Sequence, residues 1–157
     1  MTIRIGQGFD CHAFSDDSAR PLMLGGIEIP EAQGLAGHSD ADVATHALMD
    51  ALLGAACLGD LGRHFPATNE HRDASSVTML EVVLERVLDQ GWTPTSADLT
   101  IIAQGPRLEP WLPAMADLLG DHVGVDVSVK ATTTDHLGAI GRGEGICSLA
   151  IVLLEAR

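Results

Sequence analysis

Residues 40–58 read DADVATHALMDALLGAACL, and this stretch decides the fold because it is the clearest helix in the chain. Its apolar side chains recur at the 3.6-residue spacing of one helix face. They are Val43, Ala47, Leu48, Ala51 and Leu52. Ser39 or Asp40 can cap the start of this helix, and Gly59 follows its end. The many alanines permit close approach, so the segment predicts a helix packed tightly on a β-sheet.

Alternating or apolar runs on both sides of this helix predict the strands of that sheet. We expect strands at residues 3–9, 98–103, 125–131 and 146–154, and a hairpin at 22–29 that turns at Gly25 and Gly26. Further helices are expected at residues 76–90 and 110–119, with loops at 60–75 and 132–144. The last strand is almost wholly apolar, which predicts a place inside the sheet.

This order of strands and helices predicts an α+β (two-layer α/β) fold: a mixed β-sheet with helices packed on one face. The chain has 157 residues, of which 46% are hydrophobic, so we expect one domain with one core over residues 1–157. Aromatic residues make up only 3%, which predicts that the core is aliphatic.

The formal net charge of −13 argues against nucleic acid and anionic membranes as partners. No apolar run is long enough to span a bilayer. The charge does not exclude a phosphate substrate, because a metal ion and backbone N–H groups can reverse the local field. Lys130 is the only lysine in the chain.

The three cysteines are Cys11, Cys57 and Cys147. Their odd number, and the lack of a C-x-x-C pair, predict no disulfide framework and a reducing, cytoplasmic location. We expect all three to be small hydrophobic residues of the core.

Three residues form a candidate metal site. Asp10 and His12 point the same way at the end of an extended segment, and His46 joins them if the predicted helix packs beside that strand. One carboxylate and two imidazoles suit Zn²⁺ with an open fourth position, which is typical of catalytic zinc. Alone, Asp-x-His favours a surface turn with an exposed histidine, whereas His46 alone is explained equally well as a packed polar residue. A structural zinc would need a fourth ligand, for which Asp42 is near enough.

Other segments offer phosphate contacts. His38 and Ser39 stand before the helix, where free N–H groups attract anions. Three threonines at 132–134 follow a strand, and with Lys130 and Arg142 they could cradle a diphosphate, while Asp135 could hold Mg²⁺. The threonines and the GRGEG run at 141–145 can also be ordinary strand-end and turn residues.

Together these segments resemble the 2-C-methyl-D-erythritol 2,4-cyclodiphosphate synthases. The resemblance is carried, in order, by GQGFDCHAF (6–14), GLAGHSDADVATHALMDALLGAACLGDLGRHFP (34–66), TIIAQGPRLEP (100–110) and KATTTDHLGAIGRGEGI (130–146). It implies a lyase of the non-mevalonate isoprenoid (terpenoid precursor) pathway. In that reaction 4-diphosphocytidyl-2-C-methyl-D-erythritol 2-phosphate is cyclised and CMP is released. The resemblance also implies a homotrimer, with sheets assembled around the trimer axis and active sites between subunits.

The resemblance further implies residue roles. Asp10, His12 and His46 would bind Zn²⁺, and Asp135 would bind Mg²⁺ or Mn²⁺. His38 and Thr133 would stabilise the transition state. Residues 103–109 would form the cytosine pocket, and the loop from residue 63 would close over the site. The implied contacts to this cytidine diphosphate derivative are Asp10, His12, His38, Ser39, Asp60, Leu61, Gly62, Phe65, Ala103, Gly105, Pro106, Arg107, Leu108, Glu109, Thr132, Thr133, Thr134, Asp135, Ala139 and Arg142.

The sequence departs from the family pattern at three positions. Asp135 stands where the family usually has Glu, and Ala67 where it usually has Asp, so that Thr68 or Asn69 would have to replace the contact to the methylerythritol. Ala139 stands where the family usually has Phe, which would enlarge any cavity on the trimer axis. Two other functions fit the same residues: a zinc phosphohydrolase that activates water, and a binding module that captures an isoprenoid-type ligand without turnover.

Overall fold

The computed structural model describes residues 2–66 and 74–157. Its centre is a four-stranded sheet in the order β1-β6-β4-β5. The strands are β1 (Ile3–Ala13), β4 (Trp92–Ile102), β5 (Val127–Thr132) and β6 (Gly145–Ala156). β6 pairs antiparallel with β1 and β4, whereas β4 and β5 pair in parallel. The sheet is therefore mixed, and the apolar last strand lies inside it, as predicted.

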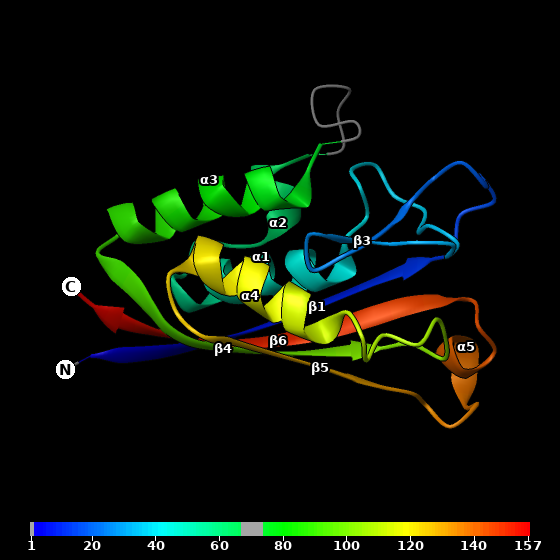
Figure 1. Ribbon diagram of the computed structural model, residues 1–157. Coiled ribbons are helices and arrows are strands. Elements are labelled where there is room, and N and C mark those ends of the chain that lie inside the picture. The colour runs from blue at the N-terminus through cyan, green and yellow to red at the C-terminus, as the bar shows by residue number, and fades with distance from the viewer. Residues whose placement is uncertain (1, 67–73) are drawn as a thin grey trace.

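The long helices cover one face of this sheet (Figure 1). They are α1 (Val43–Ala55), α3 (Ser76–Asp89) and α4 (Leu112–Val123). A hairpin of β2 (Leu22–Leu24) and β3 (Ile27–Ile29) lies beside them, and α2 (Leu61–His64) and α5 (Gly138–Gly141) are single turns. The predicted two-layer arrangement is confirmed. The segments predicted as the loops 60–75 and 132–144 each contain one of these short helices.

Close contact between β1 and α1 sets the position of the candidate site. A Cβ atom on Gly6 would lie 1.9 Å from the carbonyl oxygen of Ala51, and one on Gly8 would lie 1.9 Å from that of Ala47. Only glycine permits this approach of strand to helix. β1 is also longer than predicted and continues to Ala13, so the chain segment after Phe9 stays extended.

Asp42, rather than Ser39 or Asp40, caps α1. Its carboxylate accepts hydrogen bonds from the backbone N–H groups of Ala44 (3.1 Å) and Thr45 (3.0 Å). The same carboxylate accepts from Gly25 N (2.8 Å) and Gly26 N (2.7 Å) at the turn of the β2–β3 hairpin. The prediction of the cap was wrong because the hairpin supplies partners that are far away in sequence. The fully buried Asp42 is thereby also excluded as a fourth metal ligand.

Within the described part of the chain, the other face of the sheet carries none of the long helices (Figure 1). Large apolar side chains of β1 and β6 are exposed there: Ile3, Ile5, Phe9, Ile151 and Leu153. We call these five residues the open apolar face. Lys130 lies on the same side of the sheet and forms an ion pair with Asp98. Lys130 and Thr132 are two residues apart in β5 and share this face, so the prediction that Lys130 helps to cradle a diphosphate stays a prediction.

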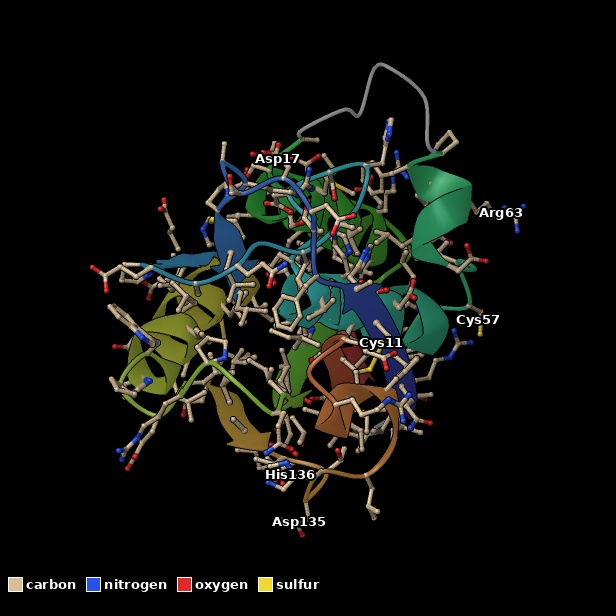
Figure 2. All side chains as sticks on the ribbon, turned by 90° about the vertical axis from the view of Figure 1, so that its right-hand side faces the viewer. Cys11, Asp17, Cys57, Arg63, Asp135 and His136 are labelled. Carbon is tan, nitrogen blue, oxygen red and sulfur yellow. A yellow bond between two sulfur atoms is a disulfide. The ribbon has the colours of Figure 1, made fainter. Side chains whose placement is uncertain are left out.

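The prediction that the cysteines form no disulfide is also wrong, although Cys147 is buried in the core as predicted. Cys11 and Cys147 are disulfide-bonded, and Figure 2 shows the bond beside the label of Cys11. Cys57 is a free and exposed thiol rather than a core residue. Cys11 and Cys147 are direct partners in the β1–β6 register, which brings opposite side chains together although 136 residues separate them in sequence. None of the described helices is long and apolar enough to cross a membrane.

Candidate metal centre and nucleotide pocket

Asp10, His12 and His46 come together as one cluster on the helix side of β1. Asp10 Oδ2 lies 2.9 Å from His46 Nδ1 and 3.2 Å from His12 Nε2. One ligand atom from each residue lies within 4.8 Å of the other two. The sequence-based prediction of this grouping is confirmed. It depends on Gly6 and Gly8, which bring the strand close enough for His46 of α1 to meet Asp10.

Each histidine of the cluster has a second hydrogen-bond partner that fixes the orientation of its ring. His12 Nδ1 donates a hydrogen bond to the carbonyl oxygen of Ala36, which leaves Nε2 as the ring nitrogen that faces Asp10. His46 Nε2 lies 2.9 Å from Ser76 Oγ and 3.2 Å from Ser39 Oγ, so its Nδ1 faces Asp10. An imidazole that donates one ring N–H to the protein presents its other nitrogen to a metal ion.

The charges of the cluster reinforce one another. Burial by itself would raise the pKa of the Asp10 carboxyl, but hydrogen bonds from His12 and His46 outweigh burial and hold that pKa well below its ordinary value. The hydrogen bond to Asp10 raises the pKa of His12, against the opposing effect of burial. Asp10 is therefore a carboxylate at neutral pH, the form that binds a cation.

The donor set fits a divalent zinc-type ion. One carboxylate oxygen and two imidazole nitrogens are a common ligand set for catalytic Zn²⁺, with the remaining position open to solvent or substrate. No other group of three or more His, Cys, Asp or Glu side chains with this geometry occurs within residues 2–66 and 74–157. The site thus offers three protein ligands and an open position.

A pocket of about 340 Å³ opens onto these ligands. It is lined by Asp10, His12, His38, Ser39, His46, Asp50, Leu61, Gly62, Phe65 and Met79. Most of the implied substrate contacts from the first half of the chain therefore meet around one cavity. Asp60 does not line it; its carboxylate accepts from Arg63 N (3.0 Å) and caps α2. The implied contact at Ala67, and its possible substitutes Thr68 and Asn69, lie outside the described residues.

Two residues of this pocket were missed by the sequence analysis. Asp50 follows His46 by four residues, and this i, i+4 spacing on one helix face could have revealed it. Its carboxylate accepts a hydrogen bond from Leu61 N (2.7 Å), and burial raises its pKa. Met79 comes from α3, and nothing in the sequence pattern around it signals a place in the pocket.

A second pocket, of about 320 Å³, gathers implied contacts from the second half of the chain. It is lined by Ala103, Gln104, Pro106, Arg107, Leu108, Ala131, Thr132 and Thr133. Gly105 and Glu109 do not line it. The Gly105–Pro106 peptide bond is cis, and Glu109 forms an exposed ion pair with Arg107.

The loop after β5 presents the remaining implied contacts at its surface. Thr134 Oγ1 donates to Leu137 O (2.7 Å), and Asp135 N donates to Thr133 Oγ1 (3.2 Å). Asp135 has a φ of 49° and projects from the tip of this loop (Figure 2). Arg142 forms an exposed ion pair with Glu144 (2.6 Å), while Ala139 is exposed in α5.

The two pockets share no lining residue and belong to opposite edges of the sheet. β1 supplies Asp10 and His12, whereas Thr132 ends β5, three strand positions away. At 4.7–4.9 Å per strand this separation is about 14 Å. Because β1, β4 and β5 all run in the same direction, both pockets open near the same end of the sheet. Within one chain they remain two separate half-sites.

The sequence matches the YgbB family over residues 3–155. The chain belongs to this family. Curated relatives named 2-C-methyl-D-erythritol 2,4-cyclodiphosphate synthase include proteins of Cellvibrio japonicus (46% identical, covering all of both chains) and Desulfitobacterium hafniense (52% identical, covering 97% of this chain and 98% of the relative). The match extends over the segments that carry both half-sites.

Solved structures of the family have the same fold. The bifunctional IspDF of Campylobacter jejuni aligns with a TM-score of 0.93 at 38% identity, covering 99% of this chain and 43% of that longer protein. A CDP complex of IspF from Plasmodium falciparum aligns with a TM-score of 0.85 at 30% identity, covering 99% of this chain and 97% of the other. The resemblance drawn from the sequence is thereby confirmed at the level of family and fold.

Proposed function

We infer that this chain catalyses the 2-C-methyl-D-erythritol 2,4-cyclodiphosphate synthase reaction of isoprenoid precursor biosynthesis. The observation that carries the inference is the Asp10–His12–His46 cluster, which lies open to a pocket in a chain that matches synthases along its whole length. The substrate would be 4-diphosphocytidyl-2-C-methyl-D-erythritol 2-phosphate, and the products would be the 2,4-cyclodiphosphate and CMP.

We propose that Asp10, His12 and His46 hold Zn²⁺ and that Asp135 binds a second divalent cation, Mg²⁺ or Mn²⁺. When bound, these ions supply positive charge that neutralises the phosphoryl oxygens of the substrate. The carboxylate of Asp10 is kept ionised by its two histidine neighbours, which supports cation binding at neutral pH. Asp135 projects from an exposed loop, where its shorter side chain remains accessible to a hydrated ion.

His38 and Ser39 are proposed to bind the phosphate groups in the metal pocket, with His38 stabilising charge in the transition state. Both residues line that pocket. In the second pocket, Thr132 and Thr133 are proposed to bind the diphosphate, and Thr133 to act as the second stabilising residue. Donors that are already oriented toward developing charge lower the barrier without reorganisation.

The cytosine is proposed to lie against residues 103–109. The backbone turn there provides donors and acceptors that can recognise a base edge, and a solved family member, 34% identical with a TM-score of 0.87, is described as the CDP-bound form of a synthase. The implied backbone contacts at Gly105 and Glu109 remain part of this proposal, although neither residue lines the pocket of the single chain.

We propose that the working enzyme is a homotrimer of one catalytic domain, residues 1–157. Two features support this assembly. The half-sites lie at opposite edges of one sheet, so a neighbouring subunit can bring its nucleotide pocket beside the metal pocket. The open apolar face would also be covered, and exposed apolar patches of this kind usually mark interfaces.

The proposed reaction is intramolecular phosphoryl transfer. The oxygen of the 2-phosphate attacks the β-phosphorus, and the bond to the CMP oxygen breaks. No protein nucleophile is required, so the task of the side chains is to bend the polyanionic substrate and align the reacting groups. In well-oriented intramolecular reactions such alignment lowers the barrier by about 7–11 kcal/mol.

Phosphorus NMR of the purified chain with this substrate, Zn²⁺ and Mg²⁺ tests the proposal. We expect the resonances of CMP and of a cyclic diphosphate to appear together, and His46→Ala to abolish both. Linear phosphates as products would instead identify a zinc phosphohydrolase. Tight binding without turnover would identify a binding module, and either result would overturn the proposed reaction.

A further inference from the structure

A chain of side-chain contacts continues from His46 to Asp40, away from the metal pocket. His46 Nε2 lies 2.9 Å from Ser76 Oγ, and Ser76 Oγ in turn contacts Asp40 Oδ1. The three residues come from different elements: α1, the first position of α3, and the loop before α1. Ser76 is fully buried. The contact between Ser76 and His46 was described above, and the further connection from Ser76 to Asp40 adds to it.

The chemistry of the groups fixes the direction of these hydrogen bonds. An ionised carboxylate is only an acceptor, so the Ser76 hydroxyl must donate to Asp40. Ser76 Oγ then accepts from His46, which places the ring proton on Nε2. Nδ1, the other ring nitrogen, faces Asp10, and with a proton held on Nε2 it could give its lone pair to a metal ion bound there. The contacts of His46 with Ser76 and Asp10 also restrict rotation of the His46 ring.

Asp40 is itself held in place by the backbone around Ser76. Its Oδ2 accepts from Ser76 N (2.8 Å), and its own N–H donates to Ala74 O (3.2 Å). Asp40 therefore caps the start of α3, where Ser75 makes no side-chain capping bond. Capping of α3 by itself would require only the hydrogen bond from Ser76 N to Asp40 Oδ2. The hydroxyl contact to His46 is an additional feature that links the cap to the metal ligand.

We propose that Ser76 and Asp40 are positioning residues for the proposed metal ligand His46, selecting the ring form and orientation that binds the ion. This proposal rests on the proposed function, since it requires a metal ion at Asp10, His12 and His46. Outer partners of this kind change metal affinity by about 10–100-fold when they are removed. The corresponding partner of His12 is the Ala36 carbonyl, which a side-chain substitution does not remove.

Ser76→Ala tests the proposal most sharply, because it removes the hydroxyl and leaves the Ser76 N–H bond to Asp40 intact. Ser75→Ala is the matched control: Ser75 is adjacent, exposed, and makes no capping bond. Zinc affinity is measured for the full chain by competition with a chromogenic chelator. We expect Ser76→Ala to bind Zn²⁺ about 10–100-fold more weakly, and Ser75→Ala to bind like the unaltered chain.

A spectroscopic readout separates positioning from a general loss of structure. In the zinc-loaded chain, ¹⁵N shifts of the His46 ring should report a protonated Nε2 and a metal-bound Nδ1, and Ser76→Ala should give a mixture of the two ring forms. Asp40→Asn is the second variant. The asparagine amide would donate to Ser76 Oγ, so the Ser76 hydroxyl would donate toward His46 instead of accepting from it. Its zinc affinity should fall as well.

The outcomes distinguish the two proposals. If the unaltered chain binds no Zn²⁺, the proposed metal site fails, whatever the variants do. If it binds Zn²⁺ and Ser76→Ala keeps both its affinity and the Nε2–H form, the positioning role is overturned while the metal site stands. If Ser76→Ala does not fold, the same decision is made with Ser76→Thr, which must retain the affinity, and Asp40→Asn, which must lose it.

Discussion

Gly8 of β1 and Ala47 of α1 are in backbone contact, and this contact positions the metal ligands. A Cβ atom on Gly8 would lie 1.9 Å from the carbonyl oxygen of Ala47 and 2.7 Å from the N atom of Ala51. Asp10 follows Gly8 by two residues on the same side of the strand, and His46 precedes Ala47. The distance between strand and helix therefore controls whether Asp10 and His46 can share an ion.

We expect Gly8→Ala to destabilise the chain and to weaken zinc binding. The added methyl group meets backbone atoms, which cannot move aside as a flexible side chain would, so the cost should be about 3 kcal/mol, the upper end of the usual range for overpacking. Denaturant unfolding and zinc competition measure the two effects.

Gly54→Ala provides the matched control for Gly8→Ala. Gly54 lies in α1, and its added Cβ would come no closer than 4.0 Å to the nearest atom, Gln7 O. Removing a helical glycine should stabilise the chain by about 1 kcal/mol and leave zinc affinity unchanged. Equal losses of zinc affinity in Gly8→Ala and Gly54→Ala would show that the close contact at Gly8 does not position the metal ligands.

His46→Ala should lose bound zinc while the proposed trimer persists. His46 supplies one of three ligands, so its removal should weaken affinity by more than the roughly 100-fold expected for an outer partner. Metal analysis of the purified variant and sedimentation give the two results.

His122→Ala is the control for this substitution, since His122 lies on α4 and pairs with Glu81, away from the cluster. Full zinc occupancy in His46→Ala would contradict the ligand assignment. Loss of zinc in both variants would point to unfolding rather than to a missing ligand.

Asp135→Asn should raise the Mg²⁺ concentration that gives half-maximal activity by about tenfold, because a hard cation binds a carboxylate more strongly than an amide. Asparagine is preferable to alanine here. The residue has a φ of 49°, and asparagine adopts that left-handed conformation readily.

Asp121→Asn, an exposed position on α4, is the control for Asp135→Asn. A Mg²⁺ titration that is the same for Asp135→Asn and the unaltered chain would mean that Asp135 does not bind the second metal ion.

The sequence predicted the ligands of the metal cluster but not the residues that hold those ligands in place. Asp10 and His12 share a strand face and His46 lies on the clearest helix, so local periodicity was sufficient to group them. Ser76 lies 30 residues after His46, and only the packing of α3 on α1 brings it there. Asp42 was misjudged for a similar reason, because its partners Gly25 and Gly26 belong to a distant hairpin.

The sequence also could not predict which residues of neighbouring strands lie opposite one another. Lys130 shares a face of β5 with Thr132, as expected, but the β4–β5 register also brings it to Asp98. A shift of one residue reverses the face of every side chain in a strand. The same dependence on register hid the pairing of Cys11 with Cys147.

Cys57 should be the one thiol that reacts with iodoacetamide in the unreduced chain, since Cys11 and Cys147 are bonded to each other. Reduction should lower the free energy of unfolding by about 2–4 kcal/mol, because the bond joins residues that are far apart in sequence. Peptide mapping without reductant and denaturant unfolding with and without it provide the measurements.

Cys57→Ser is the control for the reduction experiment and should change the denaturant midpoint little, since Cys57 is exposed. Recovery of alkylated Cys11 and Cys147 from the unreduced chain would contradict the bond. The metal ligands Asp10 and His12 alternate with Cys11 along β1 and face the opposite side of the strand, so zinc affinity should survive reduction.

Asp50→Asn should stabilise the metal-free chain at neutral pH. Burial raises the pKa of the Asp50 carboxyl above its ordinary value of 3.8, and the charges of Asp60 and Asp10 act in the same direction. The folded state therefore holds this proton more tightly than the unfolded state. The stability contributed by Asp50 is present below pH 3.8 and is lost as pH rises through the folded-state pKa.

The asparagine variant has no such proton, and its amide oxygen can still accept the hydrogen bond from Leu61 N. Unfolding curves recorded with chelator between pH 3.5 and pH 7 should therefore converge at low pH and separate as pH rises, with Asp50→Asn the more stable form. Curves that separate in the opposite sense would mean that the Leu61 bond to the ionised carboxylate outweighs burial. A constant difference at every pH would mean that the charge of Asp50 does not affect folding.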